Sequence, residues 1–294
     1  MRSIMMSSAP PSLVRPFAAQ FLLALVAFAV APRIARASKV VCGGVCAVAL
    51  GVLLVWPLMR VFPVVPIELL GARVVACIEL TLLAAPTVLF FAIAARRVPR
   101  KSDGRAMMML TAVAAVYFVK AGWWMLMPAG VGRAGSEIGK TRINQQADGS
   151  EICRQSTDYT CVAASMVTML RARGIGAEEA EMARLSFTQV GGGATDSRAM
   201  WPLEEKLEGT GLAVRYQRLD VQGLIAAPKP CMVQLDWGYF ISHMVPVMSA
   251  DVEQVVIGDP LVGRAKMTAE AFRAKWKGMA IVLENRDGTN EVQR

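Results

Sequence analysis

The stretch QSTDYTCVAASMVTMLRARG, residues 155–174, decides the fold of the second half of this chain. After Cys161, its apolar residues recur at the spacing of an amphipathic helix, and Gly174 provides the stop. Thr160 or Asp158 can cap this helix, and we expect no further role for Asp158. A cysteine in the first helical turn lies at the positive end of the helix dipole, which favours its thiolate form. The stretch therefore predicts a helix that begins with a reactive thiol.

Two more helices are predicted downstream, followed by a run of strands that contains one further helix. After Gly211 the apolar segments become short, rich in Val, Met and aromatic residues, and bounded by Gly, Pro or Asp, as strands are. Helices followed by antiparallel strands are typical of an α+β domain, with its chemistry between the two layers. The predicted helices are 177–185, 197–207 and 269–276, and the predicted strands are 213–219, 231–235, 243–248, 254–257 and 279–283.

Four residues can supply a complete set for thiol catalysis. A thiol nucleophile needs an imidazole base, an oxyanion donor and a group that orients the ring. His243 is the single histidine among the 294 residues. Gln155 lies shortly before Cys161, and Asp259 follows a neighbouring strand. A lone histidine on a strand more often only fills a core or surface position, so His243 gains its meaning from the other three residues.

Short motifs in a fixed order add to this set. They are Gln155-x5-Cys161-x2-Ala164, Lys229-Pro230-Cys-Met-Val-Gln-Leu, His243-Met-Val-Pro-Val, Gly258-Asp259-Pro260 and Phe272-x3-Trp276. In this order they resemble the bacteriocin-processing double-glycine peptidases, a papain-like group, over nearly all of residues 151–294. The resemblance implies that Cys161 is the nucleophile and His243 the base. It also implies that Asp259 orients the ring and that Gln155 donates to the oxyanion, with neither a cofactor nor a metal.

Two features depart from that family pattern. The residue after the nucleophile is commonly glycine in the family but is Val162 here, which would crowd the substrate or alter the local geometry. The best-known members sit at the cytosolic N-terminus of an ABC exporter, whereas this sequence contains no nucleotide-binding motif and carries the domain after its hydrophobic half. The cleaved substrate therefore does not carry over from the family.

Residues 1–133 are hydrophobic and basic. They hold 14 of the 32 Lys and Arg residues but 3 of the 23 acidic ones, so the net charge of +9 belongs to this half. The remainder is slightly acidic without a basic stripe, which argues against nucleic acid as a partner. Because about 20 apolar residues cross a bilayer, we expect a multi-pass α-helical membrane region with transmembrane helices at about 16–32, 40–59, 74–95 and 106–128. A linker, 134–150, would join it to the domain at 151–294.

The basic residues also predict the orientation. Arg33, Arg36, Lys39 and the cluster at 96–105 lie in the first and third connections, which should be cytoplasmic under the positive-inside rule. The peptidase domain would then lie outside the cytoplasm, anchored to the cell membrane.

An oxidising compartment would permit a disulfide between Cys153 and Cys231. Cys42 and Cys46 are expected to be small packing residues of the second span.

The sequence thus predicts a membrane-anchored cysteine peptidase that hydrolyses an exported or membrane-associated peptide, for which a double-glycine leader is one admissible cleavage signal. Its expected partners are a peptide or protein substrate, the lipid bilayer and a separate export machinery. Two alternatives stay open: a non-catalytic peptide-binding module that assists export, and a thiol acyltransferase. The complete catalytic set favours the enzyme, because binding modules of this kind usually lose those residues.

Overall fold

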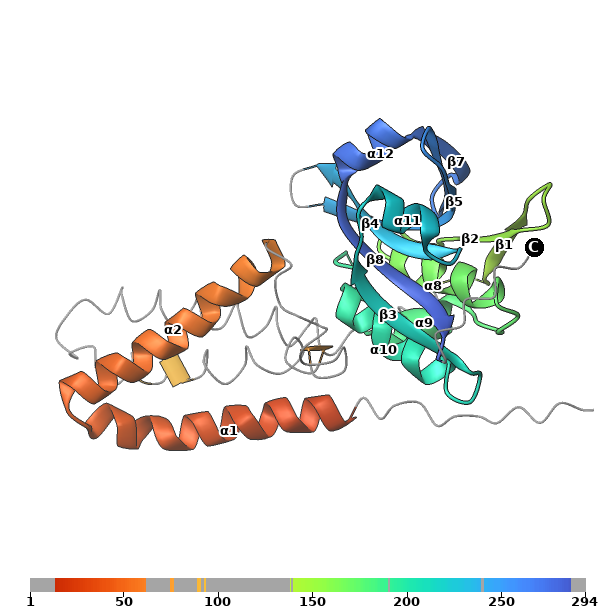
Figure 1. Cartoon of the computed structure of the whole chain (residues 1–294). Helices are drawn as coiled ribbons and strands as arrows, with labels where there is room; N and C mark the ends of the chain where they lie inside the picture. Colours follow the sequence, from red (N-terminus) through yellow and green to blue (C-terminus); the bar gives the residue numbers. More distant parts are fainter. Residues whose placement is uncertain are drawn as a thin grey trace, which may run out of the picture. The chain divides into compact units, whose positions relative to one another are not determined.

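The structure is a computed structural model of the chain. It describes residues 14–61, 75–76, 89–90, 93, 138, 140–189, 191–238 and 241–286. The chain divides into two compact units, Met1–Leu126 and Met127–Arg294 (Figure 1).

The first unit begins with two long helices, α1 (Val14–Arg36) and α2 (Lys39–Val61). Cys42 is buried in a small apolar cluster that also contains Ile93, and Cys46 packs against the same cluster. The prediction that these two cysteines are packing residues is therefore confirmed.

Within the part of the chain that the structure describes, none of the helices is both long enough and apolar enough to cross a membrane. The predicted spans 16–32 and 40–59 fall within α1 and α2. The predicted spans 74–95 and 106–128 lie outside the described residues, apart from 75–76, 89–90 and 93. The multi-pass arrangement has no support from the structure and stays a prediction.

The second unit is built around a six-stranded antiparallel sheet (Figure 1). Its strands, in spatial order, are β3 (Leu212–Arg218), β8 (Trp276–Asn285), β4 (Cys231–Gly238), β5 (Ile241–Ala250), β6 (Gln254–Asp259) and β7 (Gly263–Thr268). A separate hairpin pairs β1 (Arg142–Gln145) with β2 (Glu151–Arg154). The helices are α8 (Cys161–Arg171), α9 (Glu179–Leu185), α10 (Asp196–Lys206), α11 (Val221–Ala226) and α12 (Ala269–Lys275).

Side chains on both faces of the central strands are buried. Alternate residues of β4, β5, β6 and β8 form one core cluster, which Leu224 of α11 and Phe272 of α12 cover. Residues of the opposite alternation, such as Met232 and Met244, are also buried, and α8 packs against β4 and β5. Because side chains alternate between the faces of a strand, the sheet lies between two helical layers. The α+β prediction is confirmed for this unit.

Most predicted boundaries lie close to the observed ones. The helix that starts at Cys161 ends in a Schellman motif, in which Ile175 N–H donates to Leu170 O at 3.0 Å and Gly174 adopts a φ of 72°. Thr268 caps α12 by accepting from Ala271 N–H at 3.1 Å.

Three elements were not predicted. They are α11, β7 and the β1–β2 hairpin, and β1 lies inside the segment 134–150 that was expected to be a linker. Pairing with a neighbouring strand stabilises both β1 and β7, because each pairs along its length with β2 or β6. Ala265 and Met267 of β7 also pack against the core cluster.

Candidate active site

Cys161 is the first residue of α8, as the sequence predicts. Thr160 occupies the N-cap position, but its hydroxyl bonds with Thr157 and not with a helix N–H. Asp158 is exposed and makes no cap bond to the helix. The first intrahelical hydrogen bond runs from Ala164 N–H to Thr160 O at 3.0 Å. The N–H of Cys161 precedes that bond, so it is one of the helix-start donors available to a ligand.

Apolar packing fixes the position of this helix. Every residue from Val162 to Leu170 is buried. Ser165 also ties the helix to the sheet, since its hydroxyl donates to Met244 O at 3.0 Å. Met244 directly follows His243, so the helix that carries the thiol is bonded beside the strand position that carries the imidazole. Val162, expected to crowd the substrate, is turned into this packing and is only 3% exposed.

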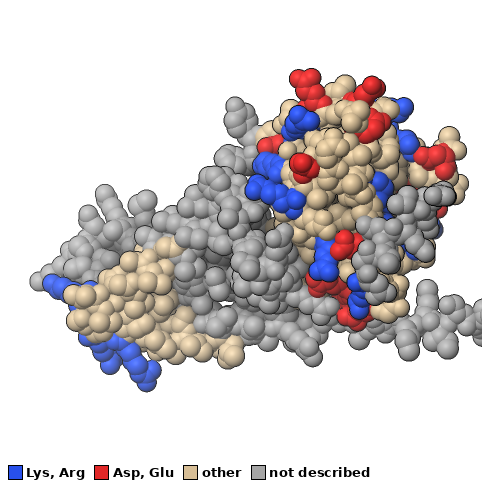
Figure 2. Space-filling view, in the orientation of Figure 1, with Lys and Arg blue, Asp and Glu red and all other residues tan. Residues whose placement is uncertain are grey.

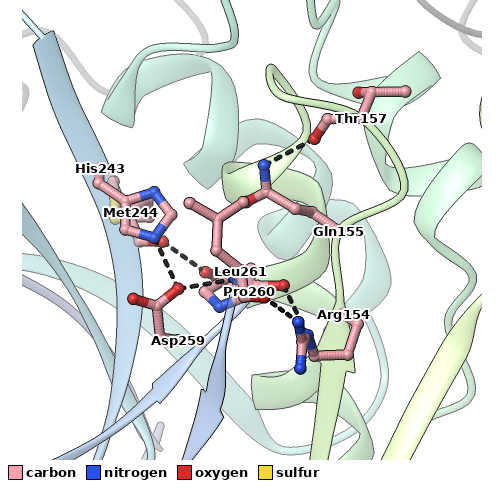
Figure 3. A network of polar contacts seen from close by, with 9 residues as sticks. Arg154, Gln155, Thr157, His243, Met244, Asp259, Pro260 and Leu261 are labelled. Atoms are coloured by element: carbon pink, nitrogen blue, oxygen red, sulfur yellow. Dashed lines mark hydrogen bonds and ion pairs between the residues drawn. The ribbon is translucent and has the colours of Figure 1, made fainter. Parts of the chain in front are cut away.

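His243 and Asp259 lie together at the end of the buried sheet. The alternation of β5 places His243 in the row of Val245 and Val247, which belongs to the core cluster. His243 Nε2 lies 2.9 Å from Asp259 Oδ1, and each residue is only 4% exposed (Figure 3). Since Nε2 is engaged by the carboxylate, Nδ1 is the ring nitrogen left for the thiol.

The charge state of the imidazole follows from its neighbours. Burial acts to lower the pKa of His243, but the hydrogen bonds with Asp259 and with Cys161, together with their charges, outweigh it and raise the pKa to about 9. Burial acts to raise the pKa of Asp259, and its hydrogen bonds with His243 and with the N–H of Leu261 bring that pKa below its usual value. The ring is therefore a cation at neutral pH, facing a half-buried thiol.

Gln155 lies on the loop between β2 and α8. Its Nε2 donates to Thr157 O at 2.6 Å, and its Oε1 has no hydrogen-bond partner among the described residues (Figure 3). An amide nitrogen carries two hydrogens, so one remains for an oxyanion. The fully buried Glu179 supports this loop, because its Oε1 accepts a hydrogen bond from Ser156 N–H at 2.8 Å.

The turn that follows Asp259 contacts the start of the same loop. Asp259 Oδ1 accepts from Leu261 N–H at 2.7 Å, and Pro260 O accepts from Gln155 N–H at 2.9 Å. The Arg154 guanidinium donates to the carbonyl groups of both Pro260 and Leu261 (Figure 3). The structure thus brings the four predicted residues into one site, with Arg154 among them.

Three residues of this site were not found from the sequence: Arg154, Glu179 and Trp237. The Trp237 ring lies over the imidazole, with the two ring centroids 4.4 Å apart and a tilt of 36°. The predicted strand 231–235 stopped two residues before Trp237, which belongs to β4 in the structure. Arg154 and Glu179 bond to main-chain groups, which leave no pattern in a sequence.

The remaining thiols of this unit do not pair. Cys153 and Cys231 are free and fully buried, so the disulfide that the sequence permitted is absent. Burial raises the pKa of Cys153 to about 12 and that of Cys231 to about 11. Neither thiol is a rival nucleophile, because a buried protonated thiol is inert.

Metal binding, and binding through a surface of one charge, have little support among the described residues. Within the described ranges, no group of three or more His, Cys, Asp and Glu side chains is placed to hold a metal ion. On the face drawn in Figure 2, acidic and basic side chains are interspersed over the second unit.

A thiol at a helix start that faces an imidazole on an antiparallel sheet defines the papain-like α+β class of cysteine peptidase domains. Residues 150–288 match the family model described as the Peptidase C39 family, and the chain belongs to this family through that domain. An uncharacterized protein of Methanothermobacter thermautotrophicus is 30% identical over 133 residues, which cover 45% of this chain and 87% of the relative. The probable functional amyloid protease FapD of Pseudomonas fluorescens is 26% identical over 149 residues, which cover 49% of this chain and 65% of FapD.

Two solved structures are also similar to the domain. The peptidase domain of Streptococcus ComA, a bi-functional ABC transporter involved in a quorum sensing pathway, is 24% identical, with a TM-score of 0.40 over 45% of this chain and 96% of that one. A double glycine motif protease from an AMS/PCAT transporter, solved in complex with a leader peptide, is 18% identical, with a TM-score of 0.39 over 50% of this chain and 94% of that one.

Proposed function

We propose that this protein is a membrane-anchored cysteine peptidase that acts through acylation of Cys161 and hydrolysis of the thioester. The observation that carries the proposal is the buried His243–Asp259 pair, with its 2.9 Å contact, facing the thiol at the start of α8. Membership of a peptidase family supports hydrolysis as the reaction. The Pseudomonas fluorescens relative is itself named a protease.

The charges at the site suit the first step. At neutral pH His243 is an imidazolium, which stabilises the Cys161 thiolate opposite Nδ1. The sulfur attacks the carbonyl carbon of the scissile peptide bond, and a C–S bond forms. The negative charge that develops on the carbonyl oxygen is stabilised by the Cys161 N–H and by the second Nε2 hydrogen of Gln155.

Proton transfers through His243 complete both half-reactions. Collapse of the tetrahedral intermediate breaks the C–N bond, and His243 Nδ1 gives its proton to the leaving amine. A water molecule then attacks the thioester while neutral His243 takes its proton. Release of the new carboxyl group restores the thiolate and the imidazolium. Throughout, Asp259 keeps the ring oriented and stabilises its charged form.

The proposed substrate is an exported or membrane-associated peptide. The apolar runs in residues 1–133, two of which contain a single charged residue (Glu79 or Lys120), support four transmembrane helices. The basic clusters at 33–39 and 96–105 support a peptidase domain outside the cytoplasm. Such a location gives access to peptides that leave the cell, including those with a double-glycine leader. In this proposal a separate export machinery delivers them.

The proposal is tested on the purified full-length chain with a peptide library that includes double-glycine leaders. We expect cleavage by the wild type and a loss of at least about 10³-fold in kcat/KM for Cys161→Ala and for His243→Ala. Cys231→Ser is the matched thiol control, because Cys231 is buried and remote from the chemistry, and its kcat/KM should stay near the wild-type value once folding is verified. Hydrolysis that survives Cys161→Ala would overturn the mechanism.

Mass spectrometry of the products separates the alternatives. Water as acceptor gives a free carboxylate, whereas an acyltransferase gives a product joined to an amine or thiol. Peptide binding without turnover by the wild type would indicate the non-catalytic module. Labelling of Cys161 in intact cells by a permeant and by an impermeant thiol reagent tests sidedness, and labelling by the permeant reagent alone would place the domain in the cytoplasm. Labelling by neither reagent would favour the non-catalytic module.

A further inference from the structure

The Asp259 carboxylate is held by the turn that follows it, not by its own strand alone. Asp259 is the last residue of β6, and its ladder with β7 resumes at Gly263. Asp259 Oδ1 accepts both from His243 Nε2 at 2.9 Å and from Leu261 N–H at 2.7 Å. Val262 N–H also donates to this carboxylate, so any movement of the turn moves contacts that fix it.

The carbonyl groups of this turn need partners outside the sheet. The last ladder pair of β6 and β7 is Asp259 with Gly263, and residues 260–262 form the turn between these two residues. The ladder therefore provides no donor for the carbonyl groups of the turn. Pro260 is buried, and its carbonyl accepts from Gln155 N–H at 2.9 Å and from Arg154 Nε at 3.1 Å. The carbonyl of Leu261 accepts from Arg154 Nη2. Both carbonyl groups are thus satisfied by Arg154, the last residue of β2, and by Gln155, the residue after it.

The shape of the guanidinium suits this arrangement. Its rigid fork presents N–H groups side by side, and here Nε and Nη2 reach two successive main-chain carbonyls. Gly263 follows the turn with a φ of 90°, and a Cβ there would lie 3.5 Å from Arg154 Nη1, so the guanidinium packs against the start of β7 at ordinary van der Waals distance. Lysine carries a single ammonium group and cannot make the same pair of bonds from one fixed position.

These contacts join the two halves of the site. Arg154 and Gln155 precede the helix that carries Cys161, whereas the turn belongs to the sheet that carries His243 (Figure 3). We propose that Arg154 is a positioning residue: its fork holds the Pro260–Leu261 turn against the strand end that bears Gln155, and so fixes the Asp259 carboxylate that orients His243. This inference rests on the proposed thiol chemistry of Cys161, but it concerns a residue that touches none of the reacting atoms.

The test reads the thiol–imidazole pair without a peptide substrate. Iodoacetamide alkylation of Cys161 is measured in the full-length chain between pH 4 and pH 11, with the modified cysteine identified by mass spectrometry. In the wild type we expect a two-step profile, in which alkylation is already measurable while His243 is charged and a second inflection near pH 9 marks loss of the His243 proton. Asp259 and Cys161 are the titratable groups that face the ring.

The key variant is Arg154→Met, and its matched control is Arg264→Met. Arg264 is a residue of β7 that bonds to Asp148 and Ser150, so it also joins the β1–β2 hairpin to the sheet. Its side chain does not bond to the Pro260–Leu261 turn. In Arg154→Met the upper inflection should fall by about 1 pH unit, about tenfold in proton affinity, while Arg264→Met keeps the wild-type profile. Arg154→Lys should also lower the inflection, since its charge remains but its fork is lost. If Arg154→Met does not fold, Arg154→Lys is read by the same criterion.

The outcomes distinguish a failure of the role proposed for Arg154 from a failure of the proposed function. A two-step wild-type profile that Arg154→Met and Arg154→Lys leave unchanged overturns the role of Arg154 and leaves the proposed function standing. An equal shift in Arg264→Met also overturns it, because the effect would then follow from any loosening of the hairpin. A wild-type profile with the single inflection of an ordinary thiol, near pH 8.5, overturns the proposed function together with the inference.

Discussion

The two sides of the active site are held in place by different forces. The helix side carries Cys161 on α8, whose next nine residues are all buried, so its position depends on apolar packing. The sheet side carries His243 and Asp259, whose final geometry depends on hydrogen bonds from the pair itself and from the Leu261 N–H. Packing tolerates changes of pH, whereas a charged hydrogen bond weakens when either partner changes its protonation state. The nucleophile should therefore stay in place under conditions that disturb its base.

The largest effect is expected from removal of the sheet-side carboxylate. Asp259→Ala leaves the ring of His243 without its orienting partner, and we expect kcat/KM to fall by about 10³–10⁴-fold. Iodoacetamide alkylation of Cys161 at pH 6 should slow as well, because a less basic imidazole stabilises less thiolate. Circular dichroism controls for folding. Wild-type alkylation rates in Asp259→Ala would show that the carboxylate does not tune the pair.

A smaller effect with a different signature is expected on the helix side. Gln155→Ala removes an oxyanion donor but neither partner of the thiol–imidazole pair, so hydrolysis should lose about 10²–10³-fold in kcat. Alkylation passes through no carbonyl oxyanion, and it should change far less than hydrolysis does. Thr157→Val is the control, because it keeps the carbonyl that orients Gln155. Equal losses in both assays would contradict the role of oxyanion donor.

The pH dependence of stability should also belong to the sheet side. The pKa of His243 rises from about 6.5 to about 9 on folding. A raised pKa contributes stability that is full below pH 6.5 and is lost as pH rises through 9, here about 3 kcal/mol. The free energy of unfolding of the full chain is measured at pH 6, 8 and 10 through the NMR signals of its single histidine. The loss should be much smaller in Asp259→Asn, and an unchanged slope in that variant would rule out this origin.

Glu179 tests how the loop before the helix is supported. Glu179→Ala leaves the Ser156 N–H without its buried acceptor, and we expect a loss of about 1–3 kcal/mol in unfolding free energy. Glu151→Ala is the matched control, since Glu151 forms a partly exposed pair with Arg171 that is worth no more than about 1 kcal/mol. Similar losses in chemical denaturation of the two variants would mean that Glu179 gives no special support.

The smallest effect concerns the ring that covers His243. Trp237 is 46% exposed, and its π-face lies 4.4 Å from the imidazole centroid. An aromatic face stabilises a nearby cation by about 0.5–1 kcal/mol at an exposed site, so Trp237→Ala should lower the pKa of His243 by less than about one unit. An NMR titration of the single histidine measures this directly. A rise in that pKa would show that the ring acts mainly by excluding water.

The sequence predicted those features best that depend on one side chain and its neighbours along the chain. The helix from Cys161 to the stop at Gly174 follows from apolar spacing and from one glycine, and both are local signals. The four site residues were predicted because their chemistry restricts the residue types. The structure places them together, while their catalytic roles stay proposals for the experiments above.

What the sequence did not predict depends on contacts between distant segments. β1 is a polar segment, and only pairing with β2 makes it a strand. Arg154 contacts carbonyl groups more than 100 positions away, and any residue type can present a carbonyl. Glu179 accepts a hydrogen bond from the main-chain N–H of Ser156. Nearly every residue type has such an N–H, so the identity of Ser156 does not predict this contact. Such support for a site becomes visible only when the chain is folded.

The β1–β2 hairpin also determines where a mechanical load would enter the catalytic unit. Arg142, at the N-terminal end of β1, pairs with Arg154, and the Thr141 hydroxyl accepts from the N–H of Glu179 at 2.9 Å. Tension along the preceding chain would therefore reach the supports of Gln155 before it reached the apolar core. A displacement of Thr141 or Arg142 would act on Glu179 and Arg154, the two residues that support the loop of Gln155, and not directly on Cys161 or His243.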